Sequence, residues 1–588
     1  MNSEKPVGVA GNQLPGWGSD TVALALRNLD IPYIALNPGA SYRGFHDSLV
    51  NFLGNEMPKM ILCLHEGNAV AIAHGYAKVT GRPMAVALHS NVGLMHGTMG
   101  IFNAFCDRQP MMIFGATGPL DAAKRRPWID WIHTARDQGA LIRNYTKWDD
   151  QPSSAQAAVE SVYRANLLAR TAPCGPVYIN LDVTLQEEAL AKPVIPPDIA
   201  RYRPAAPARP SAVSVKEAVA ALTRARKPLI LCGRASVKKE DWDRRVQLAE
   251  RLGAGVISDH KGGASFPTDH PLMVRAPMTF PQDEDAAVIR EADVILNLDW
   301  NDFAGVIRHV WKDGQPTATI IQASVDQYAH NGWSMDHQGL VPVDIQLLSD
   351  PDTAVADLLA ELPAGKAPAL PPKPAAKAAA KPVEGPLTNA HIGQALRDAV
   401  PTDQKVTFAR MPNDWSDLWP LNHPIDYLGI DGGGGIGSGP GIAIGAGLAL
   451  KGSDRLVIHV GGDGDFLMSA NAMWTAAHYE IPVLFVISNN RSYFNDEMHQ
   501  DRVARMRNRE PANRWIGQRI SDPDIDIAKL AESQGVKGFG PIEDYASLRN
   551  AMKEAVATIK SGKPAVVDVR VALRDATKAT HLGHRSGG

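Results

Sequence analysis

The sequence predicts an α/β protein of three doubly wound domains, each built on a mostly parallel sheet. Two observations carry this prediction. Short apolar runs alternate with helical patterns along the whole chain, which is typical of strand–helix–strand units. Two proline-rich breaks, at 191–212 and 363–386, divide the 588 residues into pieces of roughly 190, 150 and 200 residues, each a usual domain size.

The predicted elements recur in the same order in each piece. Predicted strands cover 84–90 and 110–117 in the first piece, 227–236, 292–300 and 318–326 in the second, and 454–465 and 481–490 in the third. Predicted helices cover 67–81, closed by Gly81, and 467–480. The predicted boundaries are a first domain at 1–195, a central domain at 205–362, a Pro/Ala/Lys-rich linker at 363–386, a third domain at 387–575 and a C-terminal tail at 576–588.

Composition excludes several kinds of partner. The chain has 60 Lys and Arg against 63 Asp and Glu, so no charge excess draws it to nucleic acid or a membrane surface, and a small-molecule partner is expected. No apolar stretch reaches about 18 residues, and the N-terminus does not resemble a signal peptide, so no membrane span is expected. Four widely spaced cysteines without a CxxC pair indicate reduced thiols and a cytoplasmic location.

Polar residues end two consecutive predicted strands of the third piece. Gly-Asp-Gly at 462–464 follows one strand, and Asn489-Asn490 ends the next. Because ligands gather beyond the carboxyl ends of parallel strands, Asp463 and Asn490 are expected to converge. A carboxylate and an amide oxygen suit Mg²⁺, and the glycines let backbone N–H groups approach a phosphate. The stretch predicts a Mg²⁺-bridged diphosphate site; the alternative is a helix cap at Asp463 and a turn at the asparagines.

The spacing resembles the signature of thiamine-diphosphate-dependent enzymes, because Asn490 follows Asp463 by 27 residues. Other stretches resemble segments of the same superfamily, in particular of benzoylformate decarboxylase and acetolactate-synthase-like enzymes: LCLHEGNAVAIAHGYAKVTGRP, NPGAS, VALHSNVG, TAPCGPVYINLDV and GGGGIGSGPGIAIG. The resemblance covers nearly the whole chain in the family's order. It implies a pyrimidine-binding domain at 1–195, then the central domain, then a diphosphate-binding domain at 387–575.

The resemblance also implies site residues. Glu66 is expected to contact the pyrimidine ring of thiamine diphosphate and to promote loss of its C2 proton. Mg²⁺ is expected at Asp463, the side chain of Asn490 and the backbone carbonyl of Ser492. Further cofactor contacts are expected at Asn413, Gly434, Ile436, Gly464, Asp465 and Tyr493, with Ile436 wedged under the bent cofactor. Because the family's active sites lie between subunits, a homodimer or homotetramer is expected.

Three features qualify this picture. The run Gly432–Gly437 satisfies the dinucleotide pattern GxGxxG, but a glycine run meets it trivially, and Pro440 is expected to interrupt the helix start. FAD binding is uncertain and not expected, because the flavin site has no compact signature. Asp465 and Arg491 depart from the family pattern; a carboxylate beside a diphosphate is repulsive unless it turns away to cap the helix or pairs with Arg491.

Histidines bear on the substrate chemistry. His89 matches a benzoylformate decarboxylase histidine that serves in proton transfer, a role suited to imidazole. His133 stands where pyruvate-decarboxylase-type enzymes have paired histidines, and only one remains after Ile132. Ala40 stands where benzoylformate decarboxylase has a serine that binds the substrate carboxylate, and Ser41 lies one position late. Glu66, His89 and His133 are therefore the predicted catalytic residues.

The sequence is compatible with three functions. The leading one is a thiamine-diphosphate- and Mg²⁺-dependent carbon–carbon lyase, decarboxylase-like, acting on a 2-oxo acid or a related 2-hydroxy ketone or acyl compound. The second is an acetolactate-synthase-type carboligase. Thr117-Gly118 and Leu181 stand where true biosynthetic acetolactate synthases usually have a glutamine and often a lysine, which argues against that assignment. The third is a non-catalytic cofactor-binding regulatory protein, which would need no carboxylate at Glu66.

Overall fold

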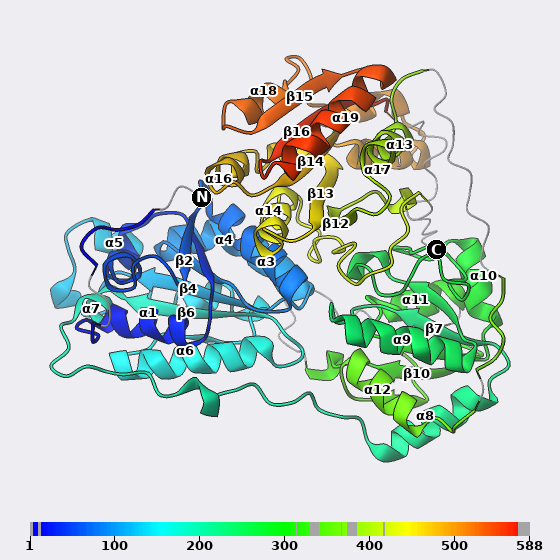
Figure 1. Ribbon diagram of the computed structural model, residues 1–588, viewed down its shortest axis with the longest axis horizontal. Coiled ribbons are helices and arrows are strands. Elements are labelled where there is room, and N and C mark those ends of the chain that lie inside the picture. Colours follow the sequence, from blue (N-terminus) through cyan, green and yellow to red (C-terminus); the bar gives the residue numbers. More distant parts are fainter. Residues whose placement is uncertain are drawn as a thin grey trace.

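The computed structural model describes residues 4–9, 13–312, 314–328, 340–365, 367–372, 385–415 and 418–573. Within these residues the chain forms three α/β domains, each around its own parallel sheet (Figure 1). The predicted fold class is confirmed. The predicted tail at 576–588 and most of the predicted linker lie outside the described residues, so the domain boundaries stay predictions.

The N-terminal domain has six parallel strands in the order β2-β1-β3-β4-β6-β5. They are β1 (Tyr33–Leu36), β2 (Lys59–Leu62), β3 (Ala85–Leu88), β4 (Met111–Thr117), β5 (Asp149–Asp150) and β6 (Pro176–Asp182). The helices are α1 (Gly18–Asn28), α2 (Arg43–Asp47), α3 (Glu66–Thr80), α4 (Ser90–Cys106), α5 (Ile129–His133), α6 (Ala155–Arg170) and α7 (Val183–Glu187). Strands β3, β4 and β6 are buried along their whole length, because helices cover both faces of the sheet.

The central domain has five parallel strands in the order β11-β10-β9-β7-β8. They are β7 (Pro228–Cys232), β8 (Gly255–Ser258), β9 (Val294–Leu298), β10 (Thr319–Ala323) and β11 (Ile345–Leu347). The helices are α8 (Ala212–Arg224), α9 (Lys239–Leu252), α10 (Asp283–Glu291), α11 (Phe303–Val310) and α12 (Pro351–Glu361). Two hydrophobic clusters form the core of this domain.

The C-terminal domain has five parallel strands in the order β12-β13-β14-β16-β15. They are β12 (Lys405–Arg410), β13 (Arg455–Gly462), β14 (Val483–Asn489), β15 (Lys537–Ile542) and β16 (Ala565–Arg570). The helices are α13 (Asn389–Ala399), α14 (Gly439–Ala449), α15 (Asp463–Leu467), α16 (Ala472–His478), α17 (Phe494–Met506), α18 (Ile527–Glu532) and α19 (Tyr545–Lys560).

Two local expectations were wrong. The helix predicted at 467–480 is two helices, because α15 begins at Asp463 and ends at Leu467, and α16 starts only at Ala472. Pro440 does not interrupt a helix: it lies in the first turn of α14, where the missing N–H has no intrahelical partner to lose.

Helices α3 and α14 join the N-terminal and C-terminal domains at very close range. A Cβ on Gly445 would overlap the carbonyl oxygen of Ile72, and one on Gly75 would overlap that of Ile442. Residues of both helices belong to one hydrophobic core that spans the two domains (Figure 1). Gly441 lies beside Asn68 and Ala71, and Gly445 beside Ile72 and Tyr76. The glycine loop before α14 lies against the C-terminal parts of α3 and α4: Lys78 donates to the carbonyl of Ile430 at 2.8 Å, and a Cβ on Gly432 would overlap Asp107.

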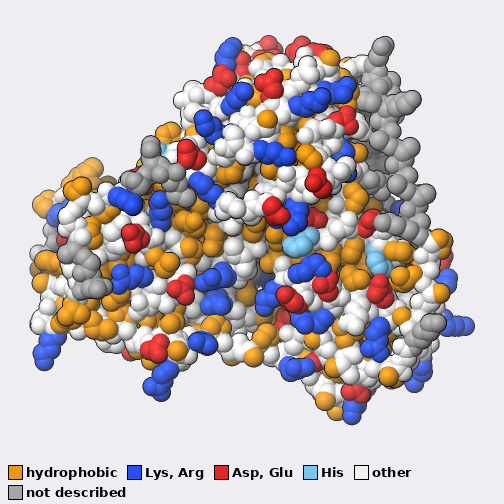
Figure 2. Space-filling model, viewed as in Figure 1, with side chains coloured by type: hydrophobic (Ala, Val, Ile, Leu, Met, Phe, Trp, Pro, Cys, Tyr) orange, Lys and Arg blue, Asp and Glu red, His pale blue; other side chains and the backbone are white. Residues whose placement is uncertain are grey.

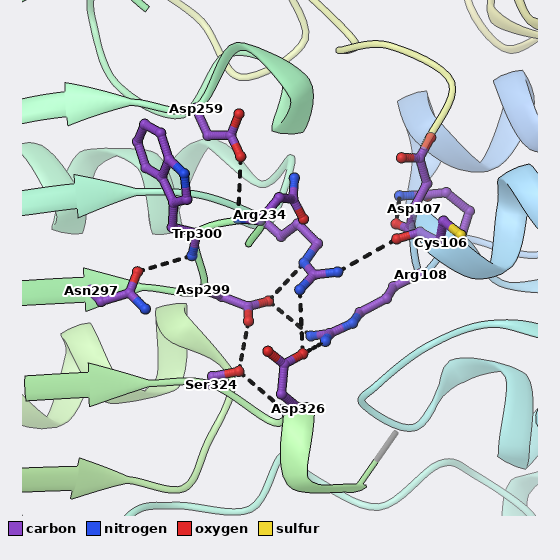
Figure 3. A network of polar contacts seen from close by, with 12 residues as sticks. Cys106, Asp107, Arg108, Arg234, Asp259, Asn297, Asp299, Trp300, Ser324 and Asp326 are labelled. Atoms are coloured by element: carbon purple, nitrogen blue, oxygen red, sulfur yellow. Dashed lines mark hydrogen bonds and ion pairs between the residues drawn. The ribbon is translucent and has the colours of Figure 1, made fainter. Parts of the chain in front are cut away.

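An ion-pair network joins the N-terminal and central domains (Figure 3). Arg108, just beyond α4, pairs with Asp326 and, at 2.8 Å, with Asp299. Arg234 lies 3.1 Å from Asp299 and 3.3 Å from Asp326. Arg234 and Asp299 follow β7 and β9, where the strand order reverses and where doubly wound sheets bind ligands. The ion-pair network, which includes the Arg108 guanidinium of the N-terminal domain, therefore occupies the usual ligand position of the central sheet.

Candidate active site

Asp463 and Asn490 lie at the carboxyl ends of the neighbouring strands β13 and β14, as the sequence predicts. Asp463 is the first residue of α15 and is buried. Burial raises the pKa of its carboxyl to about 6, and backbone N–H groups, including those of Ser492 and Asn490, oppose this rise. The structure thus brings the three residues of the predicted metal site together.

The carboxylate of Asp463 suits a cation. Its Oδ2 is buried and has no hydrogen-bond partner within the part of the chain that the structure describes. A buried oxygen without a partner is costly, and a hard divalent cation such as Mg²⁺ would satisfy it. The Oδ1 of Asn490 accepts the N–H of Ser492 at 2.9 Å, which fixes the amide beside this loop. The donor set therefore fits Mg²⁺.

Gly464 and Tyr493 are in contact, as their predicted shared role requires. A Cβ on Gly464 would lie 2.6 Å from Cε1 of the Tyr493 ring, so a larger residue would displace the tyrosine. The contact places the first turn of α15 against the start of α17. The backbone N–H groups of that turn stay close to the Asp463 carboxylate.

Asp465 turns away from this position and holds the glycine loop. Its Oδ1 accepts the N–H of Gly437 at 2.6 Å. Burial would lower the pKa of Arg410, but the Asp465 and Asp431 carboxylates hold it above its usual value, so Arg410 balances part of this charge. The pairing of Asp465 with Arg491 was wrong: Arg491 lies 3.1 Å from Asp524 instead.

The glycine loop leads to Ile436 and is anchored on the N-terminal domain. Asn103 of α4 donates to the carbonyl of Gly435 at 3.2 Å and to the hydroxyl of Ser438 at 2.8 Å. Gly434 has φ +68°, a conformation that favours glycine, and donates to the Asp431 carbonyl at 2.9 Å. Between these anchors the Ile436 side chain stays exposed, as a residue that contacts a ligand should be.

Asn413 is not joined to this group by any contact of the described residues. It begins a short 3₁₀ turn, Asn413–Trp415, and its side chain is exposed. Its predicted cofactor contact stays a prediction.

His89 lies in a cluster with Ser41 and His133. The His89 and His133 rings meet edge to face, with 4.8 Å between centroids. The Oγ of Ser41 lies 2.8 Å from Nδ1 of His89, and the Ser41 N–H donates to the same nitrogen at 3.4 Å. A Cβ on Gly39 would overlap the His89 side chain, so the loop before Ser41 packs directly on the imidazole. The two predicted histidines are brought together.

These contacts fix the protonation of His89. Because Nδ1 accepts a backbone N–H, the ring proton of the neutral form is on Nε2. Burial lowers the pKa of His89 and the neighbouring His133 lowers it further, while Glu66 opposes both. His89 is therefore a neutral imidazole near pH 7, with an N–H that points away from Ser41.

Glu66, the first residue of α3, is buried and lies next to His96 of α4, with 3.0 Å between Oε2 and Nδ1. Its charge acts on His89, so these predicted catalytic residues share one site at the N-terminal ends of α3 and α4.

Sequence reasoning missed Ser41 as a partner of His89, and it missed His96 and Asn103 altogether. A signal was present for the last two: His96, Met99 and Asn103 recur at helical spacing along one face of an otherwise apolar helix. His96 contacts Glu66, Met99 packs against the glycine loop at Gly435, and Asn103 anchors that loop. Polar residues on an apolar helix face point to a site beside it.

Three regions match known sequence families. Residues 16–141 match the N-terminal TPP binding domain of thiamine pyrophosphate enzymes, 215–358 the central domain, and 411–569 the C-terminal TPP binding domain. A probable acetolactate synthase large subunit of Methanocaldococcus jannaschii is 26% identical, over 97% of this chain and 94% of that protein. Benzoylformate decarboxylase of Pseudomonas aeruginosa is 24% identical, over 87% of this chain and 91% of that protein.

Solved structures share the fold. The thiamine diphosphate-dependent 4-hydroxybenzoylformate decarboxylase of Rhodococcus jostii superposes with a TM-score of 0.77 at 23% identity, covering 95% of this chain and 99% of that one. Benzoylformate decarboxylase of Polynucleobacter necessarius gives a TM-score of 0.78 at 20% identity, with 95% and 99% coverage. Among the described residues, no helix is both long and apolar enough to cross a membrane. Basic and acidic side chains are interspersed over the face seen in Figure 2.

Proposed function

The chain belongs to the thiamine pyrophosphate enzyme family, and on this premise we propose that it is a Mg²⁺-dependent carbon–carbon lyase that decarboxylates a 2-oxo acid or cleaves a related 2-hydroxy ketone or acyl compound. Its relatives include enzymes named as decarboxylases and as acetolactate synthases. The observation that carries the lyase proposal is the cluster of Ser41, His89 and His133 beside Glu66, which can hold and move a proton.

In this proposal the chain's own residues bind and orient the cofactor. Bound thiamine diphosphate supplies an electron sink for cleavage of the substrate's carbon–carbon bond. Asp463, Asn490 and Ser492 would hold the Mg²⁺; the Asp463 oxygen that has no hydrogen-bond partner among the described residues supports this. Glu66 would contact the pyrimidine ring, and Ile436 would support the cofactor from the anchored glycine loop.

The imidazole of His89 would handle the proton. Its Nε2–H can donate a hydrogen bond to a substrate oxygen, and its lowered pKa makes its protonated form a stronger acid than an ordinary histidine. Ser41 holds the ring and fixes which nitrogen carries the proton. The proton that replaces CO₂ on the product carbon would come through this group.

We expect His89→Ala to release aldehyde product about 10²–10⁴-fold more slowly, because general acid catalysis is worth about that factor. Ligation to an added aldehyde should fall less, since it needs no proton on that carbon. Ser41→Ala keeps the imidazole and should be affected less than His89→Ala. Rapid-quench sampling would measure each step; slowed loss of CO₂ itself in His89→Ala would place the residue earlier in the reaction.

A carboligase of acetolactate-synthase type is the second candidate, supported by the relative that matches 97% of this chain. One experiment separates the two. Protein loaded with thiamine diphosphate and Mg²⁺ is assayed on a panel of aliphatic and aromatic 2-oxo acids, with and without an acceptor aldehyde or second 2-oxo acid. Aldehyde and CO₂ in equal amounts support the lyase, and an acetohydroxy acid supports the carboligase. Absence of CO₂ with every acid, together with no cleavage of a matching panel of 2-hydroxy ketones and acyl compounds, would contradict both.

We also propose a homodimer or homotetramer with this site at the subunit interface. Large apolar side chains around the site are exposed in the single chain, among them Leu64, Met95, Met99, Ile436 and Met468. A flavin is not proposed, because the position beyond β7 and β9 is taken up by the ion pairs of Arg108 and Arg234 with Asp299 and Asp326. The free, buried Cys63 and Cys232 support a cytoplasmic location.

A further inference from the structure

Glu66 has different surroundings at its two carboxylate oxygens. Oε2 lies 3.0 Å from Nδ1 of His96, which is more than half exposed on α4. Oε1 lies over Gly93, where a Cβ would come within 3.2 Å of it. One oxygen is therefore engaged by an imidazole, and glycine keeps the space beside the other open.

A second histidine holds the first. The rings of His65 and His96 are stacked, with centroids 5.1 Å apart and planes 20° apart. Nδ1 of His65 accepts the N–H of Gly67 at 3.0 Å and so caps α3. The ligand atoms of His65, Glu66 and His96 lie within 4.8 Å of one another, which also resembles a zinc ligand set. The cap uses a lone pair that a metal would need, so a hydrogen-bonded array explains the geometry better.

We propose that His96 is a positioning residue for Glu66: it donates Nδ1–H to Oε2 and leaves Oε1 directed at the pyrimidine of the cofactor. The inference rests on the proposed role of Glu66. The hydrogen bond from His96 holds one oxygen of Glu66 at the start of α3. The side chain can then adopt only those rotamers in which the other oxygen faces the pyrimidine ring. The stack on His65 holds the His96 ring in turn, since an exposed imidazole would otherwise rotate away.

The test compares His96→Ala with His96→Asn, because the asparagine Nδ2 can occupy the position of Nδ1 and donate the same hydrogen bond. The readout is exchange of the C2 proton of bound thiamine diphosphate for deuterium, followed by proton NMR after acid quench. Affinity for the cofactor is measured separately by titration of the apoprotein. His46→Ala serves as a matched control, since His46 lies on α2 and outside the array.

We expect exchange to slow by about 10²-fold in His96→Ala, the loss typical of a misplaced catalytic group, while cofactor affinity changes little. His96→Asn should recover most of the rate, and His46→Ala should equal the wild type. Wild-type exchange in His96→Ala, or equally slow exchange in the alanine and asparagine variants, would overturn the proposal. Glu66→Gln separates this from a failure of the proposed function: if it also exchanges at the wild-type rate, Glu66 is not the activating carboxylate.

Discussion

At the scale of single residues, the candidate site contains buried carboxylates, and burial makes their charged form unfavourable. Asp463 and Asp465 are both buried, and among the described residues each has one carboxylate oxygen without a hydrogen-bond partner; the other oxygen of Asp465 accepts the N–H of Gly437 in the glycine loop. Sequence spacing could predict Asp463 and Asn490, because strand ends of a parallel sheet converge. It could not predict that Asp465 binds Gly437 rather than Arg491, because that contact joins segments far apart in the chain.

Asp463→Ala removes the one anionic ligand of the proposed Mg²⁺ site. We expect affinity for thiamine diphosphate in the presence of Mg²⁺ to fall by more than about 100-fold, because even an indirect metal partner is worth about 10–100-fold. Calorimetric titration of the apoprotein measures the loss. Removing Mg²⁺ with a chelator should weaken binding in the wild type and have little further effect in the variant. Equal chelator sensitivity in both proteins would show that Asp463 is not a ligand.

His459 makes folding sensitive to acid. It is fully buried, and burial together with the charge of Arg410 lowers its pKa to about 3, from an ordinary value of 6.5. The unfolded chain therefore binds a proton below about pH 6.5 that the folded chain refuses. Its contribution to stability is complete above that pH and declines as the pH falls toward 3, by up to about 1.4 kcal/mol per pH unit.

We therefore expect His459→Leu to flatten the acid limb of the stability curve. Urea unfolding between about pH 5 and pH 7 measures the free energy of unfolding in wild type and variant. The difference between the two should shift in favour of the variant as the pH falls. Parallel curves would show that other groups account for the acid sensitivity.

At the scale of elements, strands were predicted well and helix ends less well. Apolar runs bounded by polar residues marked β4, β9 and β14 within one or two residues, because buried parallel strands need apolar side chains on both faces. The split between α15 and α16 was missed, since an apolar pattern alone does not show a turn inside it. The closeness of α3 and α14 was not predicted either, although their glycines carried the signal.

Gly445→Ala tests that crossing. The added methyl would overlap the Ile72 carbonyl, so the two helices must separate, and we expect a loss of about 3 kcal/mol in the free energy of unfolding. Because α14 begins directly after the glycine loop, a shift of the helix would move the loop, and cofactor affinity should fall as well. Gly16→Ala is the control, since its nearest neighbour would be 3.9 Å away. Unchanged stability in Gly445→Ala would mean that the crossing relaxes without cost.

At the scale of the whole molecule, contacts between domains could not be predicted from sequence patterns. Arg108 and Asp299 are 191 residues apart, and neither belongs to a motif. Burial alone would raise the pKa of Asp299, but Arg108 and Arg234 outweigh it and hold the pKa below its usual value. The carboxylate is therefore charged inside the protein, and the central domain keeps its place beside α4 through that charge.

Arg108→Ala should lower stability by about 2 kcal/mol, because Asp299 keeps Arg234 and Ser324 but loses one charged hydrogen bond. Calorimetry should show the central domain unfolding separately, at a lower temperature than the other two. Arg143→Ala is the control, because Arg143 pairs with Asp137 and Asp149 at the surface, where such pairs contribute about 1 kcal/mol or less. A single transition at the wild-type temperature would contradict this prediction.

The crossing of α3 with α14 also sets an order of events during synthesis. At about 5–20 residues per second, the ribosome completes α14 roughly 20–70 s after α3. Throughout that interval the nascent N-terminal domain carries an uncovered helix face of glycines and small apolar residues. Helix α14, which finally covers this face, belongs to the C-terminal domain, which is made last. The proposed active site can therefore form only when translation is nearly finished.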